Sequence, residues 1–508
     1  MNSVLPDAAT AAARTATPAI VIGSGFGGLA AAIRLAAKGY DVTVLEKLDA
    51  PGGRAYVLRQ DGFTFDCGPT IVTAPFLFDE LWELFGRRFG DDVDLRPMEP
   101  FFRLHFADGE TFDYNGDHAH MEREVARLSP GDVEGYRRYL KIADRAYDIG
   151  YEKLGITPFT TFMDMLKAIP DMLRMQGIRR LMAVIRQHVK DPRLQQMLSF
   201  HPLLIGGNPM NVISVYALIS SLEQRFGVHS AMGGTGAIID AMVKLLQSQG
   251  GRLRLNSQVE EILVEDGRAA GVRLVSGERL RAPVVVSNAD AAWTYRYLLP
   301  ASARKHWTDR RIERARYSSG LFVWYFGTRR QYPEIPQHSI ILGPRYEGLL
   351  DDIFVHQRLA EDFSLYLHRP TALDPSLAPE GCDTFYVLSP VPHLESGIDW
   401  EAQAEPYRRA IEQQLHDTLL PGLKDNLVTS SVMTPLDFQS RLLAFRGAAF
   451  SFEPILLQSS WFRAHNVSED VPGLYLVGAG THPGAGLPGV LSSAKILDRV
   501  VPPVAAHV

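Results

Sequence analysis

A glycine-rich turn near the start of the chain constrains the fold most strongly. A short β-branched run, Ala19–Ile22, leads into Gly23-Ser24-Gly25-Phe26-Gly27-Gly28, and an alanine- and leucine-rich stretch of helical composition follows, up to Lys38. A second β-branched run, Val42–Leu45, ends at Glu46. This order of strand, glycine turn, helix, strand and acidic residue is typical of a dinucleotide-binding βαβ unit.

Each residue of this motif has a physical role in holding a dinucleotide. Gly23 allows the tight turn, Gly25 lets a diphosphate approach the backbone, and Gly28 lets helix and strand touch. The diphosphate then lies at the helix N-terminus, where free N–H groups and the helix dipole favour an anion. Glu46 is placed to accept hydrogen bonds from the ribose hydroxyls, which favours a cofactor without a 2′-phosphate. FAD and NAD both satisfy these requirements.

A second glycine-rich segment lies near the C-terminus. The strand-like run Leu474–Val477 is followed by the loop Gly478–Gly489 and a predicted helix over Val490–Val500. Gly484–Gly489 also matches G-x-G-x-x-G, but Pro488 stands where a helix should be running and no acidic residue follows at the right distance. We expect this loop to approach a flavin ring, with the helix N-terminus stabilising the negative charge that develops when flavin is reduced. The pairing favours FAD over NAD.

A length of 508 residues predicts two or three associated domains. Residues 76–227 are rich in helix formers and aromatics, whereas 250–289 alternates strands with turn signals, and two aromatic strands are expected over Leu321–Gly327 and Asp383–His393. We predict a mixed α/β and α+β protein: a disordered leader over 1–17, a Rossmann-like FAD-binding domain over 18–75, 228–300 and 452–508, a helical substrate and membrane-contact region over 76–227, and a substrate-binding domain over 301–451.

Composition narrows the classes of partner. The formal net charge is only −6, which gives no indication of nucleic-acid binding. The two cysteines, Cys67 and Cys382, are far apart and outside any metal-binding spacing, so we expect no disulfide, no metal site and a reducing cytoplasm. Ser199–Leu222 and Val471–Ala494 lack charged residues, but glycines and prolines interrupt both. Buried chain around an apolar ligand explains them better than membrane-spanning helices.

The segment Met165–Lys190 suggests contact with a membrane surface. It holds six Lys or Arg residues and one Asp among Met, Leu, Ile and Val. A basic amphipathic surface of this kind can lie in an anionic bilayer interface. The alternative is a helix packed on the core with a solvated basic face.

Nine segments together resemble the bacterial and fungal phytoene desaturases, members of the carotenoid oxidoreductase branch of the flavin amine oxidase superfamily. They extend in order from Ile20 to about Ala494: GSGFGGLAAAIRLAAKGY, PGGRAYV, GFTFDCGPTIVT, SFHPLLIGGNP, GGTGA, VVSNAD, SLYLHRP, VLSPVPHL and LYLVGAGTHPGAGLPGVLSSAK. The resemblance implies FAD-dependent, stepwise desaturation of the apolar C40 carotenoid phytoene to neurosporene or lycopene, with a quinone or oxygen as electron acceptor. It also implies peripheral association with the inner face of the cell membrane.

The resemblance and the motifs together predict a set of cofactor-binding residues. In relatives the Gly-Gly-Arg segment lies along the diphosphate, so Arg54 is expected to neutralise phosphate charge, and Val259 is expected near the adenine. The full set is Gly23, Gly25, Gly28, Glu46, Lys47, Gly53, Arg54, Thr70, Val259, Asn288, Gly480, Thr481, Leu487, Pro488 and Val490.

Three residues are candidates for acid–base chemistry. Asp164 and Lys167 lie three apart on a predicted helix, so they share a face and could form an acid/base pair beside a substrate tunnel. The alternative for them is a solvated ion pair. His482 is placed beside the flavin by its loop, although a structural loop histidine fits the same context.

Two other functions fit the same pattern. Rab GDP-dissociation inhibitors share the fold and bind prenyl chains without redox chemistry, but they lack the flavin motifs that this chain retains. Other carotenoid flavoenzymes, namely hydroxyneurosporene, methoxyneurosporene and diapophytoene desaturases, ketolases and isomerases, differ in tunnel depth, which spacing does not reveal.

Overall fold

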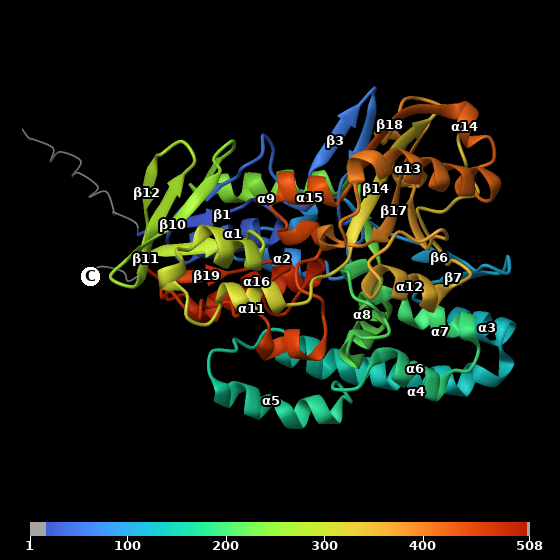
Figure 1. The fold of residues 1–508 in the computed structure, drawn as a ribbon, viewed down its shortest axis with the longest axis horizontal. Helices are drawn as coiled ribbons and strands as arrows, with labels where there is room; N and C mark the ends of the chain where they lie inside the picture. The colour runs from blue at the N-terminus through green and yellow to red at the C-terminus, as the bar shows by residue number, and fades with distance from the viewer. Residues whose placement is uncertain (1–16, 505–508) are drawn as a thin grey trace, which may run out of the picture.

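A computed structural model describes residues 17–504. The leader expected over 1–17 therefore lies, apart from Thr17, outside the described residues. The chain folds around two sheets joined by a helical region, with the N-terminal βαβ unit at the opposite side from the larger sheet (Figure 1).

The first sheet is parallel and five-stranded, and its order places the chain's first strand at the centre. In spatial order its strands are β19 (Leu474–Leu476), β13 (Val284–Ser287), β1 (Pro18–Ile22), β2 (Asp41–Leu45) and β9 (Arg252–Arg254). Three sequence segments far apart in the chain thus contribute to one sheet. The predicted strand, glycine turn, helix and strand at its centre are confirmed.

Alternation along β1 assigns the two faces of this sheet. Val21 packs with helices α1 (Phe26–Ala37), α9 (Gly234–Ser248) and α16 (Leu487–Val500). Ile20 and Ile22 face the other side, which the antiparallel meander covers. The meander consists of β10 (Val259–Glu265), β11 (Arg268–Leu274) and β12 (Arg279–Arg281). Because both faces are covered, the central strands β1 and β13 are almost wholly buried and mostly apolar.

The second sheet is mixed and seven-stranded. In spatial order its strands are β18 (Leu427–Met433), β14 (Gly320–Thr328), β17 (Asp383–Val391), β16 (Leu365–His368), β15 (His338–Ile341), β6 (Phe102–His105) and β7 (Thr111–Tyr114). The predicted aromatic strands are confirmed as β14 and β17, which pair over nine residues. The β6–β7 hairpin corrects the expectation that 76–227 is helical, because an alternating run around Asp108-Gly109 completes the edge of this sheet.

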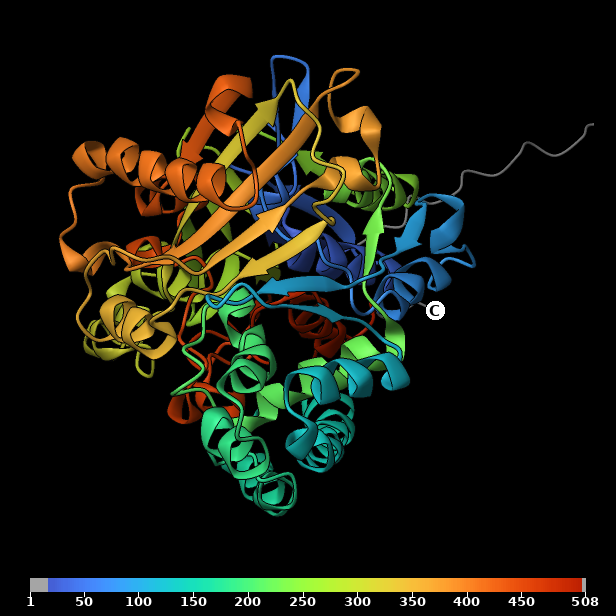
Figure 2. The same ribbon diagram turned by 90° about the vertical axis from the view of Figure 1, so that its right-hand side faces the viewer.

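A group of helices lies below the second sheet (Figure 2). Its members are α3 (His118–Leu128), α4 (Val133–Ala146), a π-helix over Tyr147–Leu154, α5 (Phe162–Arg174), α6 (Leu181–His188), α7 (Pro192–Ser199), the 3₁₀ helix η5 (His201–Ile205) and α8 (Leu218–Phe226). No helix within residues 17–504 combines the length and the apolar character needed to cross a bilayer.

The remaining strands and α-helices lie between and around these layers. They are the hairpin β3 (Val57–Gln60) and β4 (Phe63–Asp66), the pair β5 (Leu95–Pro97) and β8 (His229–Ala231), and helices α2 (Phe76–Glu83), α10 (Ala291–Trp293), α11 (Asp309–Arg314), α12 (Tyr346–Phe354), α13 (Trp400–Asp417), α14 (Leu423–Asn426) and α15 (Pro435–Leu442).

Candidate active site

One continuous cavity joins the first sheet, the second sheet and the helical region. It encloses about 440 Å³, and its wall includes the N-terminal glycine turn, the Gly-Gly-Arg segment, the C-terminal glycine loop, strands β14, β16 and β17, and the chain from η5 to α8. Both sequence-predicted glycine segments therefore meet in one place. A volume of this order accommodates a cofactor-sized or lipid-sized ligand.

The glycine turn closes one end of the cavity. Gly23 has φ +90°, and any side chain at Gly28 would collide with the carbonyl oxygen of Gly23. Gly25 is the N-cap of α1 and carries no capping side chain, so the first N–H groups of the helix are free to bind an anion. Asn288 packs beside this turn, since a β-carbon at Gly25 would lie 3.0 Å from its Nδ2.

Glu46 and Lys47 follow β2 at the rim of this end, and both line the cavity. Glu46 accepts hydrogen bonds from the backbone N–H and the hydroxyl of Ser24, at 2.8 and 2.6 Å, and from the N–H of Leu48 at 2.9 Å. The carboxylate therefore fixes the turn as well as facing the ligand. Lys47 Nζ donates to the carbonyl oxygens of Ser440 and Arg441, and partial burial lowers its pKa.

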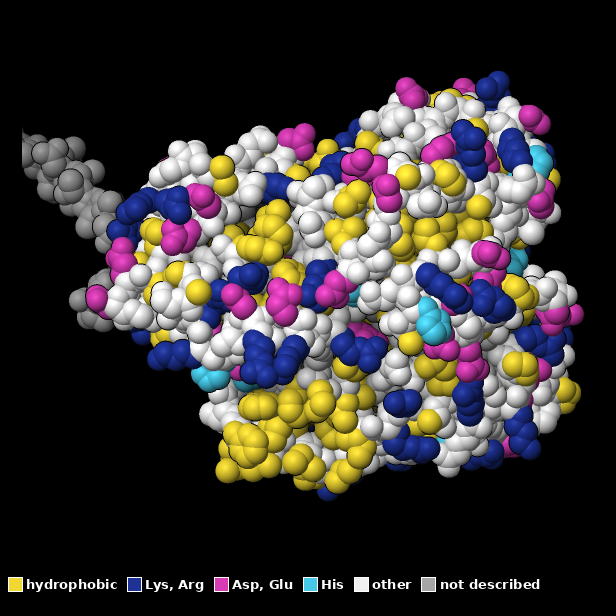
Figure 3. Space-filling view, viewed as in Figure 1, with side chains coloured by type: hydrophobic (Ala, Val, Ile, Leu, Met, Phe, Trp, Pro, Cys, Tyr) yellow, Lys and Arg dark blue, Asp and Glu magenta, His cyan; other side chains and the backbone are white. Residues whose placement is uncertain are grey.

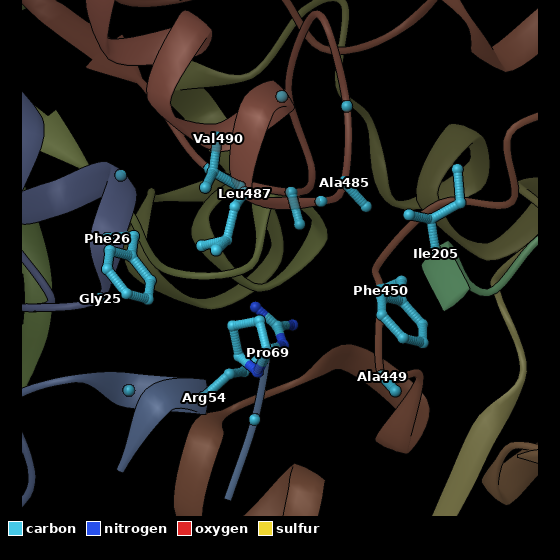
Figure 4. A pocket seen from close by; sticks show the side chains of 18 of the residues that line it. Gly25, Phe26, Arg54, Pro69, Ile205, Ala449, Phe450, Ala485, Leu487 and Val490 are labelled. Carbon is cyan, nitrogen blue, oxygen red and sulfur yellow. The ribbon is translucent and has the colours of Figure 1, made fainter. Parts of the chain in front are cut away.

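Arg54 supplies a positive charge at this end of the cavity, where it can bind an anion. Figure 4 shows its guanidinium beside Pro69, pointing into the open space that has Phe26 on one side and Phe450 on the other. Its Nε has no hydrogen-bond partner among residues 17–504, and burial lowers the pKa of the guanidinium. A buried cation without hydrogen bonds is costly unless a ligand completes it. Gly53 and Thr70 line the same wall.

Asp290 is a cavity residue that the sequence analysis did not single out. Its Oδ1 accepts from the N–H of Trp293 at 3.1 Å, capping α10, whereas its Oδ2 is buried without a partner in the described chain. Burial raises the pKa of this carboxyl, and the nearby Arg54 opposes that rise. The signal available in the sequence was its place in the VVSNAD segment, two residues after Asn288 and just beyond the end of β13.

The C-terminal loop closes the cavity from the opposite side. Leu487, Pro488 and Val490 line it as expected. The helix begins at Leu487 and not at Val490, because proline is tolerated in the first turn, where its missing N–H has no partner to lose. Arg463 stabilises the loop by donating a hydrogen bond to the carbonyl oxygen of Ala479 at 2.6 Å.

Two predicted cofactor residues of this loop lie behind the cavity wall. A β-carbon at Gly480 would come within 2.8 Å of the Ala291 side chain, so this glycine allows close packing. Thr481 is fully buried, and its hydroxyl donates to the carbonyl oxygen of Ala464 at 2.6 Å. Neither residue is part of the cavity lining, so the structure gives both of them a supporting position.

His482 lines the cavity, but its environment holds it neutral. Its Nε2 donates to the carbonyl oxygen of Leu154 at 3.0 Å, and its ring lies edge-on to Phe159 with centroids 4.9 Å apart. Burial lowers the pKa of the imidazole to about 3. The ring therefore ties the loop to the π-helix and is poorly suited to accept a proton.

The structure does not bring Asp164 and Lys167 to the cavity. Both lie on α5, as predicted, but neither contributes to the lining. Asp164 forms a capping box with Thr161, whose backbone N–H donates to it at 2.8 Å, and these hydrogen bonds lower the pKa of the carboxyl. Lys167 is exposed, and it forms no ion pair with Asp164 among the described residues. Capping explains the carboxylate better than acid–base chemistry.

The wall away from the glycine turns is mostly apolar, with a cluster of hydroxyl groups. The Thr70 hydroxyl lies 3.1 Å from the Tyr366 hydroxyl and 3.0 Å from that of Tyr386, and all three residues line the cavity. Tyr366 continues to His338 Nδ1 at 2.7 Å. Most of the rest of this wall consists of leucine, isoleucine, valine and phenylalanine side chains, including Leu321, Val323, Ile205, Ile213, Ile219, Leu222 and Phe450.

These residues fit FAD. The α1 N-terminus and Arg54 face the same space, where a diphosphate would satisfy the orphaned guanidinium. The glycine turn leaves room that any β-carbon would fill. Val259 and Glu46 lie at the rim, and Leu487 and Val490 at the loop end. The distribution suits an elongated cofactor with its charged centre at the glycine turn.

Comparison with known proteins agrees with this geometry. Residues 26–496 match the family of flavin containing amine oxidoreductases. The chain belongs to this family. Within it, the chain is 51% identical over 495 residues to a neurosporene-forming phytoene desaturase of Cereibacter sphaeroides, covering 96% of this chain and 95% of that protein. It is 48% identical over 477 residues to a lycopene-forming phytoene desaturase of Pseudescherichia vulneris, covering 94% and 97%.

Solved structures with the same fold are more distant in sequence. Putrescine oxidase bound to putrescine superposes with a TM-score of 0.61 at 15% identity, covering 95% of this chain and 99% of that one. Cyclohexylamine oxidase from Brevibacterium oxydans gives 0.61 at 14% identity, covering 96% and 98%. The fold is therefore that of the flavin amine oxidases, and the protein is an FAD-dependent oxidoreductase of the phytoene desaturase group.

Proposed function

We propose that this protein desaturates phytoene, removing hydrogens stepwise to form neurosporene, lycopene or both. The observation that carries the proposal is the single cavity in which an FAD-binding end continues into an apolar wall. Relatives that cover nearly the whole chain at 46–51% identity are phytoene desaturases of both product types. Diapophytoene desaturases match at lower identity, 35% and 30%.

The chain's own residues hold and orient a substrate that has no polar handle. When bound, FAD supplies a two-electron acceptor for a hydride. Strands β14, β16 and β17 and the η5–α8 chain supply an apolar wall that excludes water and aligns the polyene along the cavity. The glycine turn, Arg54 and the C-terminal loop fix the cofactor end, so that one saturated unit of the substrate is presented at a time.

The test is reconstitution of the FAD-loaded protein with phytoene-containing liposomes and a quinone, with separation of the carotenoid products. Red-shifted polyenes that gain double bonds stepwise are expected, and the final product fixes the number of rounds. Unchanged phytoene beside conversion of another carotenoid would contradict the proposed substrate. A purified protein that does not bind flavin would favour a prenyl-lipid binder of the same fold.

We also propose that α5 docks on the inner face of the cell membrane. Its large apolar side chains point outward: Phe162 is 59% exposed and Leu173 56%. With Met163, Leu166, Ile169 and the following Ile178 they form the α5 apolar surface, seen as the broad yellow patch at the α5 edge in Figure 3. Contiguous exposed apolar surface of this kind is typical of a membrane or partner interface.

The inner side of α5 supports this orientation. Asp171 is buried there, 2.6 Å from Lys153 Nζ, although its helix exposes phenylalanine and leucine. Asp171 thus faces in, while large apolar side chains face out beside the exposed Lys167 and Arg174, whereas an ordinary surface helix buries its large apolar residues. Met175, directly after α5, packs in the cluster beneath the helix and also lines the cavity. A lipid-soluble substrate would therefore enter beside α5.

We propose that the electron acceptor is a quinone or oxygen. Docking on the membrane favours a quinone, because it is dissolved in the same membrane. A quinone would reach the cavity by the route that the substrate uses. Rates of flavin reoxidation with a vesicle-bound quinone and with oxygen, measured after stoichiometric reduction, distinguish the two. Equal slow rates with both would contradict the proposed acceptors.

A further inference from the structure

A buried histidine–glutamate pair lies in the cavity wall, away from the residues assigned to the cofactor. His201 Nε2 and Glu223 Oε2 are 2.8 Å apart, and the two residues are 2% and 1% exposed. His201 begins η5 and Glu223 lies on α8. Both line the cavity. Burying an ionisable pair in an apolar wall is costly, so its presence there calls for a role beyond packing.

The hydrogen bond sets the tautomer of His201. A carboxylate only accepts, so Nε2 carries the hydrogen and the lone pair is on Nδ1. No hydrogen bond to Nδ1 is formed within residues 17–504. The ring itself is clamped, stacked on Phe200 at 4.0 Å between centroids and meeting Tyr114 edge-on at 5.5 Å. This is the arrangement in which a carboxylate orients an imidazole to accept a proton.

Most other ionisable groups of the cavity are committed elsewhere, and Asp290, whose Oδ2 has no partner in the described chain, lies beside Arg54 at the cofactor end. His482 donates to Leu154, and its lowered pKa, about 3, keeps it from accepting a proton. Glu46 binds Ser24 and Leu48, and Asp66 accepts from the N–H groups of Thr235 and Gly236. Of the two histidines in the lining, only His201 has a carboxylate partner.

The pair is connected to the loop that faces the flavin. The helix η5 runs from His201 to Ile205, and a β-carbon at Gly486 would lie 3.4 Å from Ile205 Cγ2. Figure 4 shows Ile205 on the same side of the cavity as Ala485. With a 3₁₀ rise of about 2 Å per residue, His201 lies roughly 8 Å from Ile205 along the axis of η5. A polyene bound in this cavity would pass along that wall.

We infer that His201 is the proton acceptor of the dehydrogenation, with Glu223 as its positioning residue. The inference rests on the proposed function. One C–H bond of the –CH2–CH2– unit breaks with its electron pair, which leaves as hydride to the bound flavin. The adjacent carbon loses a proton to Nδ1 of His201, and the electron pair of that second C–H bond becomes the new π bond. The Glu223 carboxylate balances the charge of the imidazolium.

Two variants test the roles separately. His201→Gln removes the acceptor, and Glu223→Gln keeps an acceptor for Nε2–H while removing the charge. His105→Gln is the matched control, because His105 lies on β6 and outside the cavity lining. Each FAD-loaded protein is mixed anaerobically with phytoene liposomes, and the rate of flavin bleaching is recorded. We expect about a 100-fold slower rate in His201→Gln, a smaller loss in Glu223→Gln, and the wild-type rate in the control.

A second readout does not depend on turnover. The ¹⁵N chemical shifts of histidine-labelled holoprotein report which ring nitrogen carries hydrogen. We expect a single Nε2–H tautomer for His201 in the wild type and a mixture in Glu223→Gln, because an amide can donate or accept. Wild-type bleaching with an equally fast His201→Gln overturns the acceptor, and an Nδ1–H tautomer overturns it independently. If wild type itself does not bleach, the proposed function fails and the inference with it.

Discussion

The two ends of the cavity are built by different means. At the cofactor end, backbone from three distant segments meets at glycines, and the charged groups of Glu46 and Arg54 are set by the turn geometry. At the substrate end, side chains from β14, β16, β17 and η5–α8 make the wall, and its polar groups form two separate sets, the Thr70–Tyr366–Tyr386 cluster and the His201–Glu223 pair. The first end recognises a fixed diphosphate chemistry, whereas the second recognises shape. The first should therefore be sensitive to single atoms and the second to volume and polarity.

The largest effect is expected at the glycine turn. Gly28→Ala would place a β-carbon 2.0 Å from the carbonyl oxygen of Gly23, so the backbone of the turn would have to shift. We expect a loss of about 3 kcal/mol of unfolding free energy and loss of bound flavin. Flavin content and chemical denaturation measure both. Gly90→Ala is the control, since no atom lies within 4 Å of a β-carbon there; equal losses in both variants would show that the turn is not special.

Arg54→Met tests the charged contribution of the same end. Removing a buried cation from the diphosphate should cost about 2 kcal/mol, or about 30-fold in the FAD dissociation constant. The exposed Arg59, on the neighbouring β3 and outside the cavity, provides the matched control Arg59→Met. Fluorescence titration of the apoprotein with FAD gives both constants. An unchanged constant in Arg54→Met would mean that backbone N–H groups alone hold the diphosphate.

The α5 apolar surface lies where we propose that the substrate enters, and substitutions there test its role in membrane binding. Phe162→Ser combined with Leu173→Ser should weaken binding to anionic vesicles about 10-fold, because two partly immersed side chains contribute about 1.5 kcal/mol. The fold should be unaffected, since both side chains are already exposed. Val275→Ser with Val355→Ser, at 60% and 59% exposure, is the control pair. Cosedimentation with vesicles is the measurement, and parallel losses in both pairs would exclude α5 as the docking site.

The smallest expected effect is on the pH dependence of the unfolding free energy, and it arises from Asp66, which also lines the cavity. Burial raises its pKa to about 6, although Thr235 and Gly236 donate to it from the start of α9. A carboxyl whose pKa is higher in the folded state than the ordinary 3.8 favours folding at low pH. The free energy of unfolding should therefore fall by about 1 kcal/mol between about pH 5 and pH 7 through this group.

Asp66→Asn removes that contribution. The difference in unfolding free energy between wild type and variant should change across this pH interval and be constant above it. Urea denaturation at a series of pH values provides the data. A constant difference throughout would show that Asp66 is ionised over the whole range.

The cofactor end could be predicted from sequence because its constraints are local. Gly23, Gly25 and Glu46 are spaced by one strand, one turn and one helix, so their meeting follows from regular geometry. Within this end, the start of α16 was placed three residues late, because Pro488 was taken as a helix breaker and not as a first-turn residue. Gly480 and Thr481 belong to the right loop, but close packing turns them away from the cavity.

The substrate end could not be predicted in the same way. Tyr366 and Tyr386 meet Thr70 across some 300 residues of sequence, and His201 meets Glu223 by tertiary folding alone. No characteristic sequence spacing indicates that such residues will meet in the fold. The sequence did identify this segment as amphipathic, but it did not reveal that Asp171, paired with Lys153, faces inward. Asp164, chosen there for its helical spacing with Lys167, is a capping residue.

Anaerobic titration of the FAD-loaded protein with phytoene in liposomes tests the central claim most directly, because it counts electrons and double bonds together. The account predicts that bleaching of each flavin is accompanied by one new carbon–carbon double bond in the recovered carotenoid. Full retention of oxidised flavin, with phytoene recovered unchanged from a protein that binds both, would contradict it.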